Sequence, residues 1–484
     1  MSGPRALPRK VVVAGDGQLG ALTAIALRKA LPGTEVLVIG TPPDPAAMAD
    51  RSPTALPFTN RLHDRLGIDE ERLVREAGAS HRLVVRYLGW GGAGHEGVAP
   101  YGATIDPRLK TGFARAWGGG PRNASTEAPP GSLAEVLAAE GRFQPPSGEA
   151  GGVLADLDYA LRWNVSAYRD MLVREAQRMG VGYVRGAVGA MRPDGQGGIA
   201  AVAIEGVGTF DADLFIDCTG PGAALLSQLD EAKREDWSGA LPIRALLYGQ
   251  PGEARLDLED RVTVSSVGWL SELAGRDGHQ ALLAMTEQTT QDQAYAALPA
   301  EPGNAVPLDP GCATAPWIGN VIALGDAAAH FEPLAWLNLD LAHRQLALLL
   351  ELLPGRVPDP RERAEFNRRA GLMAGRVRDL LGAHYAAPGA AHLGSLARSP
   401  ELELELDQYH RRGRLPFFEE APLVTQEASA LFHALGHSAG ESVLARAADP
   451  AEGDTARAAF AAKAQAALAA VPPYGAWMRQ VLQG

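Results

Sequence analysis

The chain has 484 residues, 46% of them hydrophobic and 21% charged, which is enough apolar sequence for a buried core and excludes a disordered protein. Its net charge of −12 argues against a nucleic-acid partner, because no basic patch stands out to bind a phosphate backbone. The only two cysteines, Cys218 and Cys312, provide neither a disulfide framework nor a metal-ligand spacing, so we expect a cytoplasmic protein without a metal site.

The N-terminal residues predict a βαβ unit. Residues 10–14 are a short, apolar, β-branched run, which is typical of a buried parallel strand, and residues 35–39 repeat this pattern. Between them, residues 21–31 have helical spacing, and Pro32-Gly33 ends the helix. Residues 41–57 are rich in Pro, Ala and Asp and predict a loop on the surface.

Helical and strand patterns continue along the rest of the chain. Helices are expected at residues 60–77, 168–179, 360–385, 425–435 and 456–470, and after Asp326 as far as Leu353. Strands are expected at residues 83–88, 199–204 and 208–216 and within 241–269.

Two apolar stretches are too polar to be targeting or membrane segments. The N-terminal run contains Asp16 and Gln18, and no small-residue cleavage pattern follows it, which is unlike a signal peptide. Residues 334–353 include Asp340 and Arg344, which do not fit a lipid span. We therefore expect no membrane association.

Three glycines follow the first strand. Gly15, Gly17 and Gly20 stand at the strand-to-helix junction, where a tight turn, a close backbone approach and helix–strand packing each favour a missing Cβ. The amides that begin the following helix, together with its dipole, would attract a diphosphate. The alternative is a glycine-rich turn without a ligand, since such triplets also arise by chance.

A second motif lies some three hundred residues further on. The apolar run 316–324 leads into Gly325-Asp326, and small residues suited to a helix N-terminus follow. A carboxylate there can accept hydrogen bonds from a ribityl chain, while helix amides face a flavin or its phosphates. The alternative is an ordinary N-cap aspartate.

Together the two motifs indicate the two parts of one FAD site. The acidic residue that commonly holds a ribose hydroxyl after the second strand is missing, because Gly40-Thr41 stand there. This difference favours a loosely held flavin.

The chain resembles the flavin-dependent tryptophan halogenase family, within the broader aromatic-hydroxylase-like flavoproteins. The matching segments are residues 15–20, 212–220, 316–334, 365–368 and 378–385. With the motifs, the resemblance implies that FAD is bound by Gly15, Gly17, Gln18, Leu19, Gly20, Gly220, Gly325, Asp326, Pro333, Leu337 and Asn338.

The predicted fold is α/β, with a Rossmann-like FAD-binding domain, an interleaved mixed β-sheet substrate domain and a helical C-terminal region. The FAD-binding domain is expected to comprise residues 1–60, 180–225 and 315–350. The substrate domain is expected at residues 61–179 and 226–314, and the helical region at 351–484.

The chain departs from the family at residues tied to halide chemistry. The family's lysine is replaced by Arg82, whose guanidinium stays protonated and cannot act as a free amine. The family's glutamate is replaced by Ala335, and the Thr-Gly pair that cradles halide in relatives becomes Leu337-Asn338. The Gly-Trp-x-Trp-x-Ile-Pro signature is reduced to residues 268–273. We therefore expect that the family's halogenation is lost.

Several residues are candidates for contacting the substrate. Those expected to orient it are Arg82, Trp269 and His330. Those expected to wall an aromatic pocket, together with Trp269, are Trp336, Trp90 and Tyr101. The alternatives are plain core aromatics and, for His330, a helix-surface or capping group.

These features favour a monooxygenase that hydroxylates an electron-rich aromatic such as an indole, free or as a tryptophan within a peptide. Reduced FAD and oxygen would form a C4a-hydroperoxide, because the cofactor carries the difficult chemistry. No second dinucleotide fingerprint is evident, so the resemblance implies a separate NAD(P)H-dependent flavin reductase as partner. The alternatives are a halogenase with a non-standard active site and a non-catalytic flavin-binding protein.

Overall fold

The computed structural model describes residues 6–102, 131–146, 152–155, 157–394, 396–441, 443, 447 and 450–483. The chain divides into two compact units. Unit 1 comprises Met1–Ala79, Arg162–Leu246 and Ala305–Arg378, and unit 2 comprises Ser80–Leu161, Leu247–Asn304 and Asp379–Gly484. Within the described ranges, no helix has the length and apolarity needed to cross a bilayer.

Unit 1 is built on a six-stranded sheet. Its strands, in spatial order, are β19 (Trp317–Ile318), β20 (Val321–Ala323), β11 (Leu214–Asp217), β1 (Lys10–Ala14), β2 (Glu35–Gly40) and β7 (Gly182–Arg185). All neighbouring strands are parallel except β19, which is antiparallel to β20. Val12 lies opposite Leu37 on one side and Phe215 on the other, and all three side chains are buried. Continuous apolar runs are expected for strands covered on both faces, and the predicted Rossmann-like α/β sheet is confirmed.

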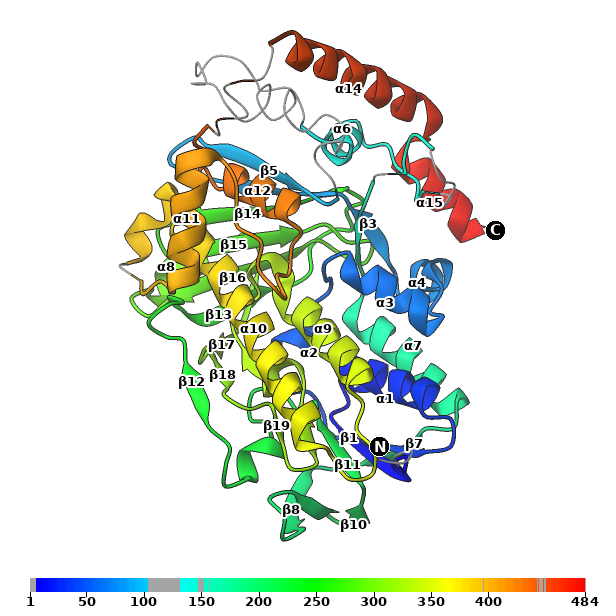
Figure 1. Ribbon diagram of the computed structural model, residues 1–484. Coiled ribbons are helices and arrows are strands. Elements are labelled where there is room, and N and C mark those ends of the chain that lie inside the picture. The colour runs from blue at the N-terminus through cyan, green and yellow to red at the C-terminus, as the bar shows by residue number, and fades with distance from the viewer. Residues whose placement is uncertain are drawn as a thin grey trace. The chain divides into compact units, whose positions relative to one another are not determined.

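The helices of unit 1 pack on this sheet and on one another. They are α1 (Gln18–Ala30), α2 (Met48–Arg51), α3 (Phe58–Leu66), α4 (Glu70–Glu76), α7 (Val165–Arg178), α9 (Leu337–Glu351) and most of α10 (Pro360–Tyr385). Helices α1 and α7 lie side by side (Figure 1). Asn164 caps α7, because its side chain accepts the amide hydrogen of Ala167 at 2.9 Å.

Residues 60–77 form two helices where the sequence predicted one. Helix α3 ends at Gly67, which has a φ of 61° and closes the helix in the left-handed conformation. Asp69 then caps α4 by accepting the amide hydrogen of Glu71 at 3.2 Å. The helical periodicity continues across this break, which is why the pattern alone did not reveal it.

Two smaller sheets and three short 3₁₀ turns complete unit 1. The strands of the first sheet are β8 (Val188–Pro193), β9 (Ile199–Ile204) and β10 (Gly208–Asp211). Those of the second are β12 (Arg234–Asp236), β18 (Gly311–Ala313) and β21 (Ala329–His330). The turns are η2 (Leu226–Gln228), η3 (Gly325–Ala327) and η4 (Leu334–Trp336).

Unit 2 contains most of a seven-stranded mixed sheet, of which residues 243–246 of β13 and 305–307 of β17 are assigned to unit 1. Its strands, in spatial order, are β17 (Pro302–Pro307), β13 (Ile243–Gly249), β16 (Gln280–Thr286), β15 (Gly268–Leu273), β14 (Glu259–Ser265), β4 (Val84–Leu88) and β5 (Glu96–Pro100). Strands β14 and β4 are parallel, whereas β4–β5, β14–β15 and β15–β16 are antiparallel pairs. A separate pair joins β3 (Ser80–Arg82) to β6 (Ala160–Arg162).

The helical elements of unit 2 are largely C-terminal. They are α6 (Leu133–Ala139), α8 (Gln291–Ala297), η5 (Pro388–Leu393), α11 (Pro400–Arg412), α12 (Thr425–Ala434), α14 (Pro450–Ala470) and α15 (Tyr474–Gln483). The helices predicted at residues 425–435 and 456–470 are therefore confirmed. Helix α11 has an N-terminal Ser399 cap and ends at Gly413 in the left-handed conformation. Leu402, Leu406 and Phe432 form a buried cluster between α11 and α12.

The two compact units do not follow the predicted domain boundaries, and the predicted domains stay a prediction. Residues 61–79 and 162–179, predicted in the substrate domain, belong to unit 1, and so do residues 226–246 and 305–314. Helix α7 packs against α1, and α4 packs against α7, which ties both to the six-stranded sheet. The C-terminal helices belong to unit 2, except for most of α10. An amphipathic pattern shows that a helix covers a sheet, but not which sheet it covers.

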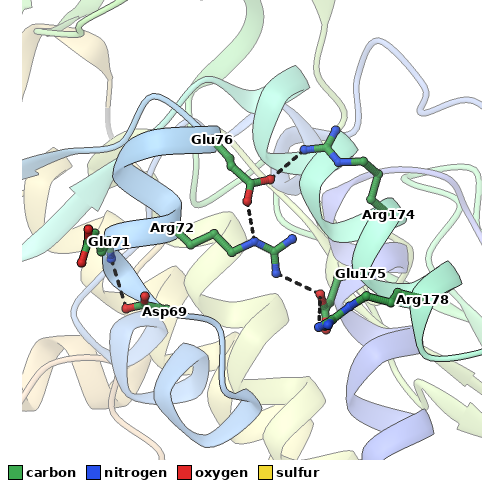
Figure 2. Close-up of polar contacts among 7 residues, drawn as sticks. All are labelled: Asp69, Glu71, Arg72, Glu76, Arg174, Glu175 and Arg178. Carbon is green, nitrogen blue, oxygen red and sulfur yellow. Dashed lines mark hydrogen bonds and ion pairs between the residues drawn. The ribbon is translucent and has the colours of Figure 1, made fainter. Parts of the chain in front are cut away.

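An ion-pair network fastens α4 to α7 (Figure 2). Arg72 contacts Glu76 at 2.7 Å and Glu175 at 2.9 Å, while Arg174 reaches Glu76 at 2.9 Å. Arg178 adds a contact to Glu175 at 2.6 Å. Hydrogen bonds from Arg178 lower the pKa of Glu175, and those from Arg72 lower the pKa of Glu76. The network therefore stabilises unit 1 while both carboxylates are ionised.

We expect Glu175→Gln to lower the free energy of unfolding by about 1 kcal/mol at neutral pH, because it removes two cation contacts in a half-exposed network. The pKa of Glu175 is lower in the folded state, so this contribution is present above the unfolded pKa and is lost as pH falls through the folded value. Urea unfolding at pH 7 and at acidic pH measures both effects. Glu71→Gln, which removes only an exposed pair with Arg75, is the control. An equal loss at both pH values would contradict the assignment.

Candidate functional site

The glycine turn joins β1 to α1 in unit 1. Gly15 has a φ of 123°, and a methyl group there would collide with the carbonyl oxygen of Cys218. A methyl group on Gly20 would collide with the carbonyl oxygen of Gly15. These two glycines are therefore required by the tight turn and by packing of α1 against the strands.

Gly17 leaves room for a carboxylate of the protein itself. A methyl group on Gly17 would collide with the side chain of Asp50, which comes from α2. The amide of Leu19, in the first turn of α1, donates a hydrogen bond to Asp50 Oδ1 at 3.0 Å. An oxyanion thus occupies the positive end of α1, which is where the sequence predicts a diphosphate.

A short segment of unit 1, residues 48–52, links the two predicted motifs, and we call it the clip. The amide of Ala49 donates to Asp326 Oδ2 at 2.7 Å. Gln18 Nε2 donates to the carbonyl oxygens of Ala49 at 2.7 Å and Ser52 at 2.8 Å. A methyl group on Gly325 would collide with the side chain of Leu19. The glycine turn and Asp326 therefore lie together.

The clip corrects the prediction that residues 41–57 form a surface loop. Ala47, Met48, Ala49 and Asp50 are buried, and α2 packs against α1 and α9. Small alanines allow this close packing, and Ala47 also faces Gly220, which has a φ of 91°. The Pro, Ala and Asp content was interpreted as a loop signal, although Ala and Met favour helix.

Gln18 is held entirely by protein groups. Its Oε1 accepts from Trp163 Nε1 at 3.1 Å, and its amide nitrogen donates to the two clip carbonyls. In the structure this side chain positions the clip, and cofactor binding by Gln18 stays a prediction.

The electrostatics of the turn are dominated by carboxylates. Burial, helped by the charge of Asp326 and opposed by the hydrogen bond from Leu19, raises the pKa of Asp50 to about 7. Arg169 of α7 forms an ion pair with Asp16. The charge of Asp50 therefore changes near neutral pH.

Asp326 is buried and does not begin a long helix. Its Oδ1 lies 3.0 Å from His330 Nδ1, and its Oδ2 is used by Ala49. The predicted helix from Asp326 to Leu353 is wrong in its first part, because η3, β21 and η4 precede α9. Pro333 lies within this stretch and cannot donate the amide hydrogen that a helix interior requires. His330 belongs to β21, paired with β18, and is not a helix-surface group.

The backbone before α9 is strained at two residues. Ala335 has a φ of 55° and Trp336 a φ of 58°, both in the left-handed region that side chains with a Cβ disfavour. Trp336 is nevertheless buried, and so are Pro333 and Leu337, the first residue of α9. Asn338 Nδ2 donates to the carbonyl oxygen of Phe331 at 2.8 Å, which fixes the entry to the helix.

We expect Ala335→Gly to raise the free energy of unfolding by about 0.5–1 kcal/mol, because glycine adopts a positive φ without the Cβ penalty. Thermal or urea unfolding measures the change. Ala328→Gly, in the same stretch but with a φ of −94°, is the matched control and should lower stability. A loss of stability in Ala335→Gly would show that the left-handed backbone costs nothing here.

Arg82 belongs to unit 2 and is fixed by that unit. Its side chain is 1% exposed, and Nη1 lies 3.1 Å from Asp260 Oδ2, on β14. The guanidinium also lies over the ring of Tyr101, 5.0 Å from its centroid. Arg82 is therefore a buried cation paired with a buried carboxylate.

Trp269 and Trp90 are also residues of unit 2. The indole of Trp269 donates to Tyr385 Oη at 3.0 Å, and that of Trp90 donates to the carbonyl oxygen of Val262 at 3.0 Å. Both side chains are fully buried, and Trp90 packs edge-on against His384. The structure places both indoles in the core of the unit, with their N–H groups satisfied.

Three residues escaped the sequence analysis. Asp50 lies in a segment interpreted as loop, Arg169 on a helix with many charges, and Asp260 within a strand. Each pairs with a residue far away in the chain, so no local spacing reveals it. The one local signal for Asp50 was that an acidic residue directly follows the apolar run Ala-Ala-Met-Ala.

Comparison with known proteins places this arrangement in a family. The model of the tryptophan halogenase family matches residues 10–436. Tryptophan 7-halogenase KtzQ of Kutzneria sp. is 28% identical over 413 residues, covering 78% of this chain and 76% of that protein. BrvH, a flavin-dependent halogenase from Brevundimonas sp. BAL3, superimposes with a TM-score of 0.86 at 24% identity, covering 98% of this chain and 99% of that one.

A further solved structure has the same fold. MibH, described as a lanthipeptide-type ("lathipeptide") tryptophan 5-halogenase, superimposes with a TM-score of 0.83 at 20% identity, covering 100% of this chain and 95% of that one. At these identities the two solved structures establish the fold. The flavin-dependent halogenases among these relatives are enzymes that use FAD.

Proposed function

This chain belongs to the tryptophan halogenase family, and from that premise we propose that it is an FAD-dependent monooxygenase of an electron-rich aromatic substrate. The substrate would be an indole, either free or as a tryptophan within a peptide. The observation that carries the proposal is the clip, which holds the glycine turn and Asp326 together in unit 1. In such an enzyme, bound reduced flavin supplies the oxygen-activating chemistry.

The residues at the turn fit a dinucleotide. The amide of Leu19 already donates to a carboxyl oxygen of Asp50, so it is directed at a place where a phosphate oxygen can accept the same hydrogen bond. Gly17 carries no side chain on the face that a backbone–phosphate approach requires, and the Asp50 side chain fills that face here. We assign the diphosphate to this turn and the flavin end to the segment of Gly325, Asp326 and the start of α9.

His330 acts as a positioning residue in this proposal. Its Nδ1 contacts Asp326 Oδ1, and Asp326 in turn holds the Ala49 amide. Removing the imidazole would release one oxygen of a buried carboxylate and loosen the clip. We retain roles in orienting the substrate for Arg82 and Trp269, and wall positions for Trp336 and Trp90, as predictions.

The residues at the positions that the family uses for halide chemistry, Arg82 and Ala335, favour hydroxylation over halogenation. Arg82 is paired with Asp260 and cannot supply a free amine. Ala335 carries no carboxylate, and its backbone is left-handed. The family resemblance itself favours the second candidate, a halogenase that works without these groups.

The proposal implies a separate flavin reductase, because the sequence contains no second dinucleotide fingerprint. We also place the protein in the cytosol. Both cysteines are free and buried, which suits a reducing compartment.

The test supplies the purified protein with FAD, a flavin reductase, NADH, oxygen and either tryptophan, indole or a tryptophan-containing peptide, with and without chloride or bromide. Mass spectrometry is expected to detect a product that has gained one oxygen, in equal yield with and without halide. A product carrying the halogen isotope pattern would establish the second candidate instead. Flavin binding without any product would identify a non-catalytic flavin-binding protein.

A further inference from the structure

Asp50 occupies the place at which the proposed function puts a diphosphate. We propose that Asp50 is a built-in competitor of the dinucleotide, holding the first-turn amide of α1 until a diphosphate displaces its carboxylate. The inference rests on the proposed function and concerns how tightly this chain holds the dinucleotide. It commits to ligands with a diphosphate group, and not to flavins as such.

The competition follows because the Asp50 carboxylate and a phosphate group need the same volume beside Gly17. The carboxylate lies against Gly17 on the side where a Cβ would project, and it accepts from Leu19. A phosphate that bonded the same amide would need the same volume. Because two anions cannot share one donor at hydrogen-bond distance, one must leave.

Asp50 can leave without dismantling the clip. The clip is held at Ala49 by Asp326 and by Gln18, and at Ser52 by Gln18. None of these bonds uses the Asp50 side chain. In this inference the Asp50 side chain rotates off the amide but stays buried beside the diphosphate, while the backbone of residues 48–52 stays in place.

The charges around the turn also oppose the binding of a diphosphate while Asp50 is ionised. The titratable groups whose charges act on Asp50 or are altered by it are Asp16, Asp326, Arg169 and Cys218, and His330 is linked to it through Asp326. The one cation, Arg169, is already paired with Asp16. An incoming diphosphate adds negative charge beside an ionised Asp50, so the neutral form of Asp50 is the one compatible with a bound dinucleotide.

The pH dependence has a definite sign. Burial raises the pKa of Asp50 to about 7 before any ligand is present. A bound diphosphate raises this pKa further, so binding takes up a proton and affinity falls as pH rises above 7. At pH 8, one unit above this pKa, the need to neutralise Asp50 weakens binding about tenfold.

The experiment titrates FAD, ADP-ribose and riboflavin into the wild-type protein, Asp50→Asn, Asp50→Ser and Asp64→Asn by calorimetry. ADP-ribose has a diphosphate without a flavin, and riboflavin has a flavin without phosphate. Asp64 is an exposed acid of α3 in the same unit, so its replacement removes an equal charge away from the turn. Circular dichroism confirms that each variant is folded.

At pH 8 we expect Asp50→Asn and Asp50→Ser to bind FAD and ADP-ribose about tenfold more tightly than wild type, with riboflavin and Asp64→Asn unchanged. Between pH 6 and 8 the wild-type affinity for ADP-ribose should fall about tenfold, and that of Asp50→Asn should stay constant. The wild-type profile tests the inference even if a variant does not fold.

Other outcomes separate the inference from the proposed function. FAD binding that is unchanged or weaker in the Asp50 variants, with a flat wild-type pH profile, would overturn the inference and leave the function intact. The expected Asp50 effects without any flavin-dependent product would support the inference and overturn the monooxygenase. Failure of every ligand to bind any variant would overturn both.

Discussion

Replacing Asp217 with alanine is expected to lower the free energy of unfolding by about 3–5 kcal/mol, because it leaves several buried donors without an acceptor. Asp217 ends β11 and is fully buried. Its Oδ1 accepts from the amide and hydroxyl of Thr219 at 3.1 and 2.7 Å. Its Oδ2 accepts from the amides of Leu225 and Leu226 at 2.8 and 2.9 Å.

This carboxylate fixes the loop that follows the strand, including Gly220. Asp217→Asn keeps one acceptor oxygen and should lose roughly half as much stability. Asp211→Ala is the control, because that carboxylate is 83% exposed and only contacts Lys10 at 4.0 Å. Chemical denaturation with linear extrapolation measures all three. If Asp217→Ala loses no more stability than Asp211→Ala, the stabilising role assigned to the four hydrogen bonds of Asp217 is wrong.

Arg82→Met is expected to cost about 3–5 kcal/mol, because it leaves the carboxylate of Asp260 buried without its cation. Both side chains are at most 2% exposed, and their atoms lie 3.1 Å apart. The double replacement of Arg82 by Met and Asp260 by Leu should regain most of this loss, since an apolar pair of similar volume carries no desolvation cost. A double-mutant cycle in urea measures the coupling.

A neighbouring ion pair provides the matched control. Arg86 and Glu259 lie on the same two strands, β4 and β14, and make a bidentate contact at 2.8 and 2.7 Å. Without Arg86, the Glu259 carboxylate, which is 13% exposed, keeps its contact with Arg261 at 3.2 Å. Arg86→Met should therefore cost only about 1 kcal/mol. Equal losses of stability in Arg82→Met and Arg86→Met would show that burial of the Arg82–Asp260 pair does not raise the cost of breaking it.

The sheet of unit 1 was predictable because its strands are locally distinct. Val11, Val12 and Val13 are apolar, β-branched and consecutive, and a central parallel strand buried on both faces requires this. The glycine turn was predictable for the same reason, since the packing of Gly15 and Gly20 leaves no volume for a side chain. The strand and the turn were therefore predictable because the residue types they require stand close together in the sequence.

The contents of the site were less predictable because they depend on partners far away in the chain. Nothing near Asp50 in the sequence indicates that it will reach Leu19, and nothing near Arg82 indicates Asp260. The helix boundary at Leu337 was missed because its signal is a left-handed backbone at Ala335 and Trp336. Neither residue type normally adopts that conformation, so only the surrounding packing determines it.

The middle of the six-stranded sheet also has a consequence for synthesis on the ribosome. Strand β11 pairs with β1 on one side and with β20 on the other, and β20 is translated long after both. A nascent chain that ends before Val321 exposes one edge of β11 as an unpaired template for other chains. Such long-range closure is slow, so this protein should depend on chaperones until its last third has emerged.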